Sequence, residues 1–136
     1  SVAAARGLAM ARKIPVAGVP VLDAMALDAG FSVVATEAPR GLLFSQFTGS
    51  APVQSTFEDM PLPPAGTTAQ VIGFRAGDIA ERIGGVVRAP LYSLPEAIAR
   101  AAMRMIQSGD VPLPVPLYIR PADAAPARDK PPVMLD

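Results

Sequence analysis

The chain of 136 residues contains no cysteine and no histidine. Without them it offers no disulfide, no thiol nucleophile, no zinc site of the usual Cys/His kinds and no Ser-His-Asp triad. These absences exclude most hydrolase mechanisms. Carboxylate-based metal catalysis is the exception, because Mg²⁺ needs only oxygen ligands and the chain has aspartate and glutamate.

The chain also lacks an excess of charge and a long apolar run. Lysine plus arginine number 12, as do aspartate plus glutamate, and no basic block gathers that would follow the phosphates of a nucleic acid. We therefore expect no direct nucleic-acid binding by this chain alone. No uncharged apolar stretch approaches the ~20 residues that span a bilayer, and Arg6 and Arg12 interrupt the apolar start, unlike in a signal peptide. These patterns predict a cytoplasmic protein with no membrane segment.

Enough apolar residues are present for a core. Hydrophobic residues make up 51% of the chain and charged residues 18%, which is typical of one globular domain. From Val2 onward the residues are already helix formers, and no acidic first turn or apolar strand precedes them. We interpret the chain as a fragment of a longer α/β protein that lacks the first half of its amino-terminal subdomain.

The first thirty residues are expected to form a helix, a strand and a helix. The first helix is predicted over residues 2–13, a continuously apolar strand over residues 14–19, and a second helix from Pro20. One face of the second helix would hold Leu22, Met25, Ala26 and Ala29. Gly30 is expected to cap that helix in a left-handed conformation.

Three strands should follow as an antiparallel meander. Residues 31–38 and 41–48 flank the turn Pro39-Arg40-Gly41, and residues 52–57 offer the third strand. Phe44, in the second strand, is expected to lie in the core.

Strands and helices alternate after a proline-rich loop at residues 60–67. The pattern predicts a strand over residues 70–74, a small helix over residues 78–83, and a further strand at Val86 and Val87.

The last helix is predicted over residues 94–107. Ser93 and Glu96 have the spacing of a capping box, in which each side chain satisfies the other residue's unpaired amide. Arg100 and Arg104 would face water, and the buried face would hold Leu94, Ile98, Ala101 and Met105. The proline-rich residues after Gly109 are expected to form an extended tail, anchored by Leu117, Tyr118, Ile119 and Arg120.

This order of elements predicts an α/β fold, with helices flanking a mixed sheet. Among such folds, the ribonuclease H-like, actin-like ATPase (ASKHA) class fits best. We divide the chain into a remnant of the amino-terminal subdomain at residues 1–30, a carboxy-terminal ribonuclease H-like subdomain at residues 31–109, and a proline-rich extended tail at residues 110–136.

Two groups of residues and one proline-rich run are candidates for function, and we assign no catalytic site and no metal site. On the first helix, Ala3, Gly7, Met10 and Ala11 would let a partner helix approach closely, although they could equally be buried against the parent protein's own sheet. At the hairpin, Arg40 and Gly41 could face a ligand or could simply form the turn. Glu37, in the same hairpin, could bind a metal only if further carboxylates lay on neighbouring strands. The run Pro112–Pro116 resembles a ligand of proline-binding modules, but such runs also serve as rigid connectors.

Four segments occur in the same order as in one bacterial family. They are Ala5–Ala9 (ARGLA), Ile14–Val19 (IPVAGV), Ala35–Gly41 (ATEAPRG) and Pro116–Arg120 (PLYIR). On these segments the chain resembles TsaB (YeaZ), the non-catalytic glycoprotease-like paralogue of TsaD in the synthesis of threonylcarbamoyladenosine in tRNA. The hairpin of the family usually reads Asp-Ala-Arg-x-Gly-Glu-Val-Tyr, of which only Ala38 and Gly41 match, so the resemblance implies a divergent member.

The resemblance implies a scaffold subunit without an active site. It would bind a TsaD-type catalytic partner, join a TsaE-type ATPase and pair with itself, since helices of the amino-terminal half pair subunits in the family. ATP and a divalent metal would belong to the partner or to a shared interface, with no cofactor in this chain. Two alternatives stay open: a glycoprotease-like peptidase of the M22 type, which would need an activated nucleophile or a metal-held water, and an unrelated ribonuclease H-like domain.

Overall fold

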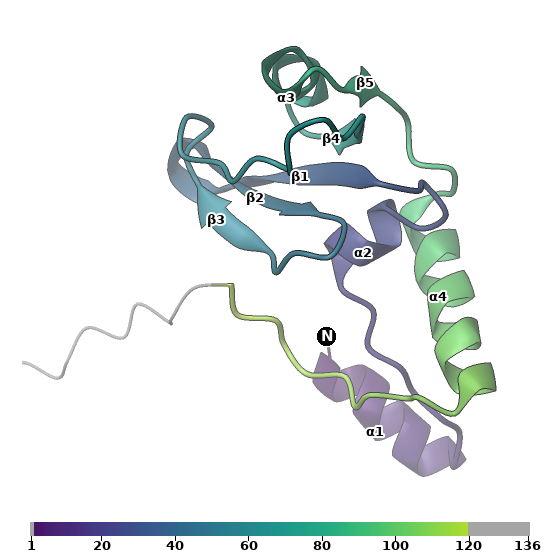
Figure 1. Cartoon of the computed structure of the whole chain (residues 1–136). Helices are drawn as coiled ribbons and strands as arrows, with labels where there is room; N and C mark the ends of the chain where they lie inside the picture. The colour runs from purple at the N-terminus through teal and green to yellow at the C-terminus, as the bar shows by residue number, and fades with distance from the viewer. Residues whose placement is uncertain (1, 120–136) are drawn as a thin grey trace, which may run out of the picture.

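Five strands form one mixed sheet, in the order β3-β2-β1-β4-β5, in a computed structural model that describes residues 2–119 (Figure 1). The strands are β1 (Ser32–Ala38), β2 (Leu42–Phe47), β3 (Val53–Ser55), β4 (Gln70–Gly73) and β5 (Val86–Val87). The first three form the predicted antiparallel meander, whereas β4 pairs in parallel with both β1 and β5. The mixed α/β sheet with flanking helices, predicted from the order of elements, is confirmed.

Helices lie on both faces of the sheet and beyond it. They are α1 (Val2–Arg12), α2 (Val21–Met25), α3 (Ala76–Ile83) and α4 (Leu94–Ser108). α3 covers one face of the sheet, α2 contacts the other face, and α4 packs beside α2. α1 lies apart from the sheet, at the lower end of the molecule, with the segment that follows α4 running beside it (Figure 1). Within residues 2–119, no helix is both long and apolar enough to cross a membrane.

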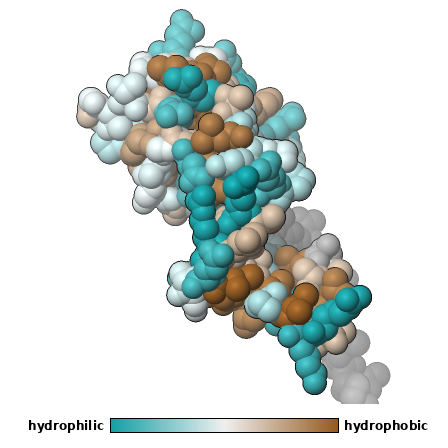
Figure 2. Space-filling model, turned by 90° about the vertical axis from the view of Figure 1, so that its right-hand side faces the viewer, coloured by the Kyte–Doolittle hydropathy of each residue, from teal (hydrophilic) through white to brown (hydrophobic). Residues whose placement is uncertain are grey.

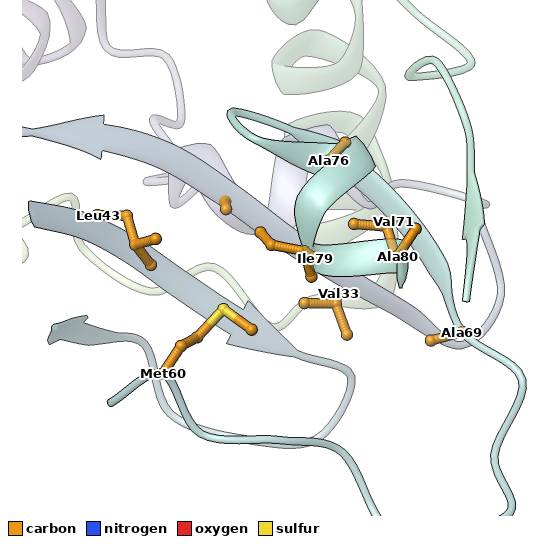
Figure 3. Packing of buried hydrophobic residues seen from close by; sticks show 9 residues of the cluster. Val33, Leu43, Met60, Ala69, Val71, Ala76, Ile79 and Ala80 are labelled. Carbon is orange, nitrogen blue, oxygen red and sulfur yellow. The ribbon is translucent and has the colours of Figure 1, made fainter. Parts of the chain in front are cut away.

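The core has two sides because successive side chains of a strand point to opposite faces. Ile79 and Ala80 of α3 point toward Val33 and Val71 of the sheet (Figure 3). The complete cluster on that side is Val33, Ala35, Leu43, Met60, Ala69, Val71, Ala76, Ile79 and Ala80. On the opposite side Leu22 and Ala29 pack with Val34 and Ile72.

The β1–β2 hairpin matches the sequence prediction in its turn and differs in one core residue. Ala38 pairs with Leu42, and Gly41 takes a positive φ of 73°, as its place in the turn requires. Arg40 also has a positive φ, 64°. Phe44 was expected in the core but is only half-buried, against the α2 side, while Leu43 is 1% exposed on the α3 side.

The segment at residues 14–19 is extended but is not the strand that its apolar sequence predicts. No strand pairs with it among residues 2–119. Pro15 cannot donate a ladder hydrogen bond, and the backbone packs instead against Pro114. α2 is also shorter than expected and ends at Met25, because the next residues form turns and Asp28 has a positive φ of 61°. Gly30 has the expected positive φ, 71°, but follows this turn rather than capping the helix.

α4 has the predicted position but not the predicted cap. Within the described chain, Ser93 makes no side-chain capping bond. The Glu96 carboxylate, the other half of the predicted box, pairs with Arg100 at 2.8 Å. Leu94 is exposed, whereas Ala97 and Ala101 are buried and Ile98 and Met105 are half-buried, because the neighbour of α4 is the short helix α2.

The segment after α4 is held by a different residue from those predicted. Leu117 and Tyr118 are exposed and Ile119 is half-buried, while Pro114 is buried. Arg120 lies outside the described residues. The division of the chain at residues 30 and 109 stays a prediction.

Candidate interaction surface

The small-residue face of α1 is open to solvent. Ala3, Gly7, Met10 and Ala11 are all exposed, and Met10 is 80% exposed. A methyl group added at Gly7 would meet no atom within 4 Å. In the described chain this face is therefore surface and is not covered by the sheet.

A groove of about 450 Å³ lies along the neighbouring face of α1. α1 contributes Arg6, Ala9 and Met10 to it. The other lining residues are Lys13, which directly follows the helix, and Ile14, Pro15, Val16, Val111 and Leu113. Most of these side chains are apolar, and the two charged ones are both basic. Figure 2 shows hydrophobic patches beside hydrophilic side chains on the lower lobe, at the height where Figure 1 places α1.

One close backbone contact fixes the far wall of this groove. A Cβ atom on Gly18 would lie 2.8 Å from the Cα of Pro114, so only glycine permits this approach. Pro114 is buried in this contact. Along the chain it directly follows the groove residues Val111 and Leu113, and the residues after it, 115–118, are exposed. The proline-rich run thus forms one wall of the groove, and its role as a rigid connector stays a prediction.

Charge is distributed unevenly along the chain. Residues 2–19 contain three basic side chains, Arg6, Arg12 and Lys13, and no acidic one, whereas acidic residues outnumber basic ones by nine to six in residues 20–119. None of these three basic side chains takes part in an ion pair among residues 2–119. The α1 end is consequently a positive region of a neutral chain.

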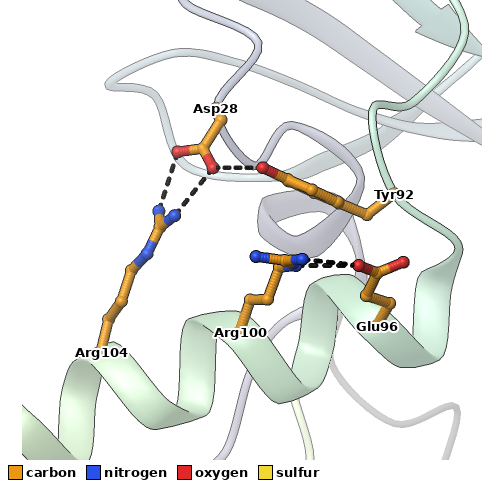
Figure 4. A network of polar contacts seen from close by, with 5 residues as sticks. All are labelled: Asp28, Tyr92, Glu96, Arg100 and Arg104. Atoms are coloured by element: carbon orange, nitrogen blue, oxygen red, sulfur yellow. Dashed lines mark hydrogen bonds and ion pairs between the residues drawn. The ribbon is translucent and has the colours of Figure 1, made fainter.

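Apart from the groove, a cluster of polar side chains joins α4 to the loop before β1 (Figure 4). The Arg104 guanidinium donates two hydrogen bonds of 2.8 Å to Asp28, and the Tyr92 hydroxyl donates a third of 3.1 Å. The hydrogen bonds from Arg104 lower the pKa of Asp28 to about 2. Partial loss of solvation acts in the opposite direction and raises this pKa, but its effect is smaller. The pKa of Arg104 is raised by the same contact. Arg100 lies 4.5 Å above the centroid of the Tyr92 ring.

This cluster escaped the sequence reasoning. Asp28 and Arg104 are 76 residues apart, and the helical pattern of α4 predicted only that Arg104 faces water. Because all of its members already pair with one another, we assign the cluster a structural role: it fastens α4 to the rest of the fold.

The hairpin candidates lie at one end of the sheet. Glu37 is exposed on β1, opposite Leu43, and Arg40 and Gly41 are exposed in the turn. Within the described part of the chain, no three carboxylates are grouped closely enough to hold a metal ion. Arg40 and Gly41 form the turn, whereas Glu37 belongs to β1, and a ligand-facing role for them stays a prediction.

The groove also escaped the sequence reasoning, apart from Met10. Val111 and Leu113 are about a hundred residues from α1 along the chain, and a proline-rich run gives no periodic signal of the surface it meets. The concentration of basic residues before position 20 was the sequence signal that could have indicated a charged binding surface at this end of the chain.

Comparison with known proteins gives a likeness at the level of the fold. No family model matches the chain, and no curated protein matches it. Among solved structures, the chain is similar to the crystal structure of an uncharacterized protein with similarity to peptidase YeaZ from Pseudomonas aeruginosa, with a TM-score of 0.64 and 20% sequence identity. The match covers 88% of this chain and 65% of that protein, so the chain spans less than two thirds of its length. At this identity the likeness shows a common α/β fold.

Proposed function

We propose that the chain belongs to a non-catalytic scaffold subunit of the TsaB (YeaZ) type, which binds a TsaD-type catalytic partner in making threonylcarbamoyladenosine in tRNA. The observation that carries this proposal is the likeness in fold to a protein similar to YeaZ over 88% of the chain. The order of the four sequence segments supports it independently. In this proposal the sheet belongs to the ribonuclease H-like, actin-like ATPase class.

The surface that suits the partner is α1. Gly7 leaves its helix open to close approach, and the exposed side chain of Met10 adds apolar area. Ala3 and Ala11 complete this face, and the same face would serve self-pairing. ATP and divalent metal would be held by the partner or at the shared interface, a TsaE-type ATPase would join the complex, and the assembly would work in the cytoplasm.

Titration of the protein with a purified TsaD-type protein, followed by an assay of threonylcarbamoyladenosine on tRNA, tests the proposal. We expect a complex with a Kd in the micromolar range or below, which corresponds to about −8 kcal/mol or stronger, and tRNA modification that depends on the protein. No binding at about 100 μM, with modification unchanged when the protein is left out, would contradict the proposal.

A peptidase is the second candidate, because the similar structure is described by its likeness to peptidase YeaZ. We expect no turnover of casein or of a fluorogenic peptide, with or without Mg²⁺ or Mn²⁺. Metal-dependent turnover that disappears in Glu37→Gln, and persists in the exposed-site control Glu81→Gln, would favour the peptidase over the scaffold.

A further inference from the structure

We infer that the groove between α1 and the segment at residues 111–113 receives an amphipathic partner helix whose apolar face is bordered by aspartate or glutamate. This inference deepens the proposed function and rests on it, because it describes the chemistry of the partner's contact. It places the partner's contact in the groove, which lies beside the small-residue face of α1 and shares only Met10 with it.

The shape of the groove suits an apolar side of a helix. Met10 is 80% exposed, Ile14 is 55% exposed and Leu113 is 68% exposed, and all three line the same groove. Large apolar side chains that gather around one concave surface mark an interaction site more often than isolated ones do. Amphipathic helices commonly bind by laying their apolar face into such a groove.

Charge decides which amphipathic helix fits. Arg6 and Lys13 line the groove and are exposed, and no carboxylate lines it. Neither side chain has an ion-pair partner among the described residues. A carboxylate that borders the apolar face of the partner would pair with them, while a lysine or arginine there would be repelled.

The groove and the small-residue face adjoin each other on α1. Arg6 and Ala9 lie on one face of α1, and Lys13 follows at the same three- and four-residue spacing, directly after the helix ends at Arg12. Ala3, Gly7 and Ala11 share another face, roughly a third of a turn away, and Met10 lies between the two. Met10 lines the groove and borders the small-residue face, so we treat the two adjoining surfaces as one binding region.

The groove exists before any partner arrives. Because Gly18 and Pro114 are in close backbone contact, the wall that carries Val111 and Leu113 is held against residues 14–18. A wall that is already ordered costs less conformational entropy on binding than one that must fold around the partner.

Charge reversal at the α1 end of the molecule, inside and outside the groove, tests the inference. The double variant Arg6→Glu/Lys13→Glu changes the groove, and Arg12→Glu is the matched control, because Arg12 is exposed on α1 but does not line the groove. Binding of each variant to the TsaD-type partner is measured by titration at low salt and at about 0.5 M salt, after circular dichroism has shown native folding. The oligomeric state of each variant without partner is measured by light scattering.

We expect the double variant to bind about tenfold more weakly or worse at low salt, and Arg12→Glu to bind within about twofold of the unaltered protein. The gap should narrow at high salt, where exposed charges are screened over a few ångströms. Equal effects of the two variants, or tighter binding by the double variant, would overturn this inference and leave the proposed function standing.

Two further outcomes distinguish a failure of the proposed function from a failure of this inference alone. If the unaltered protein does not bind the partner at all, the proposed function fails and this inference with it. If the double variant instead dissociates a dimer of the chain while partner binding is unchanged, the groove belongs to a second copy, and the inference is wrong.

Discussion

At the scale of single residues, the alternation of side chains along β1 determines which of them enter the core. Val33 and Val34 are neighbours in sequence, face opposite sides of the sheet, and are 1% and 2% exposed. The sequence predicted the strand because β-branched residues are concentrated there. It could not show which face of β2 is the better covered, and the prediction of Phe44 in the core was wrong for that reason.

Leu43→Ala should lower the free energy of unfolding by about 3 kcal/mol, because it leaves a cavity beneath α3. Phe44→Ala should cost less, since its ring is already half in water. Urea unfolding of both variants checks the order of the two effects. A greater loss for Phe44→Ala would show that the two faces of β2 have been assigned the wrong way round.

Gly73→Ala should destabilise the protein by about 2 kcal/mol or more. Gly73 has a φ of 100°, and an added Cβ would collide with the carbonyl oxygen of Ala35 and approach Met25. Gly7→Ala is the matched control, because Gly7 lies inside a helix with open space around it and should gain about 0.5–1 kcal/mol. Thermal melts that rank the two variants in the opposite order would contradict the packing described for β4.

At the scale of elements, the sequence predicts best where a segment's own pattern decides its structure. The hairpin, the meander, α3 and α4 all follow from local periodicity and turn residues. Residues 14–19 fail this test because a strand needs a partner strand, and the sequence cannot supply one from its own pattern. The positions of α4 and of residues 111–119 depend on contacts made far away in the chain, at Asp28 and Gly18.

Asp28→Asn should lower the melting temperature at pH 7, with the effect fading in acid. The folded-state pKa of Asp28, about 2, is below its ordinary value of 3.8, so the charged carboxylate stabilises the fold above about pH 4. This stabilisation is lost as the pH falls from about 4 through 2. Asparagine tolerates the positive φ of Asp28, so the change leaves the backbone intact.

Melting curves of Asp28→Asn and of the unaltered protein at pH 7, 4 and 2 measure this effect. Asp110→Asn serves as the control, since Asp110 is exposed and forms no ion pair among the described residues. If the deficit of Asp28→Asn at pH 2 equals that at pH 7, the Arg104 contact is not what holds α4.

At the scale of the whole molecule, charge and exposed apolar side chains separate the α1 end from the sheet. The sheet with α2, α3 and α4 contains both core clusters, while α1 contributes only Ala9 to the buried residues of the described chain. The sequence indicated α1 as an interaction surface through its small residues, and the structure adds the groove and the close contact between Gly18 and Pro114 at its far wall. These additions could not be predicted because they arise where segments distant in sequence meet.

The most direct test of the central claim, that α1 is the partner-binding surface, is size-exclusion chromatography of Gly7→Glu with the TsaD-type partner. Gly77→Glu is the control, because Gly77 is also an exposed helical glycine with open space around it, on α3. We predict that Gly7→Glu folds natively and elutes separately from the partner, because a charged side chain would be buried unpaired between two closely packed helices. Gly77→Glu should co-elute with the partner as the unaltered protein does. Co-elution of folded Gly7→Glu with the partner would contradict the account.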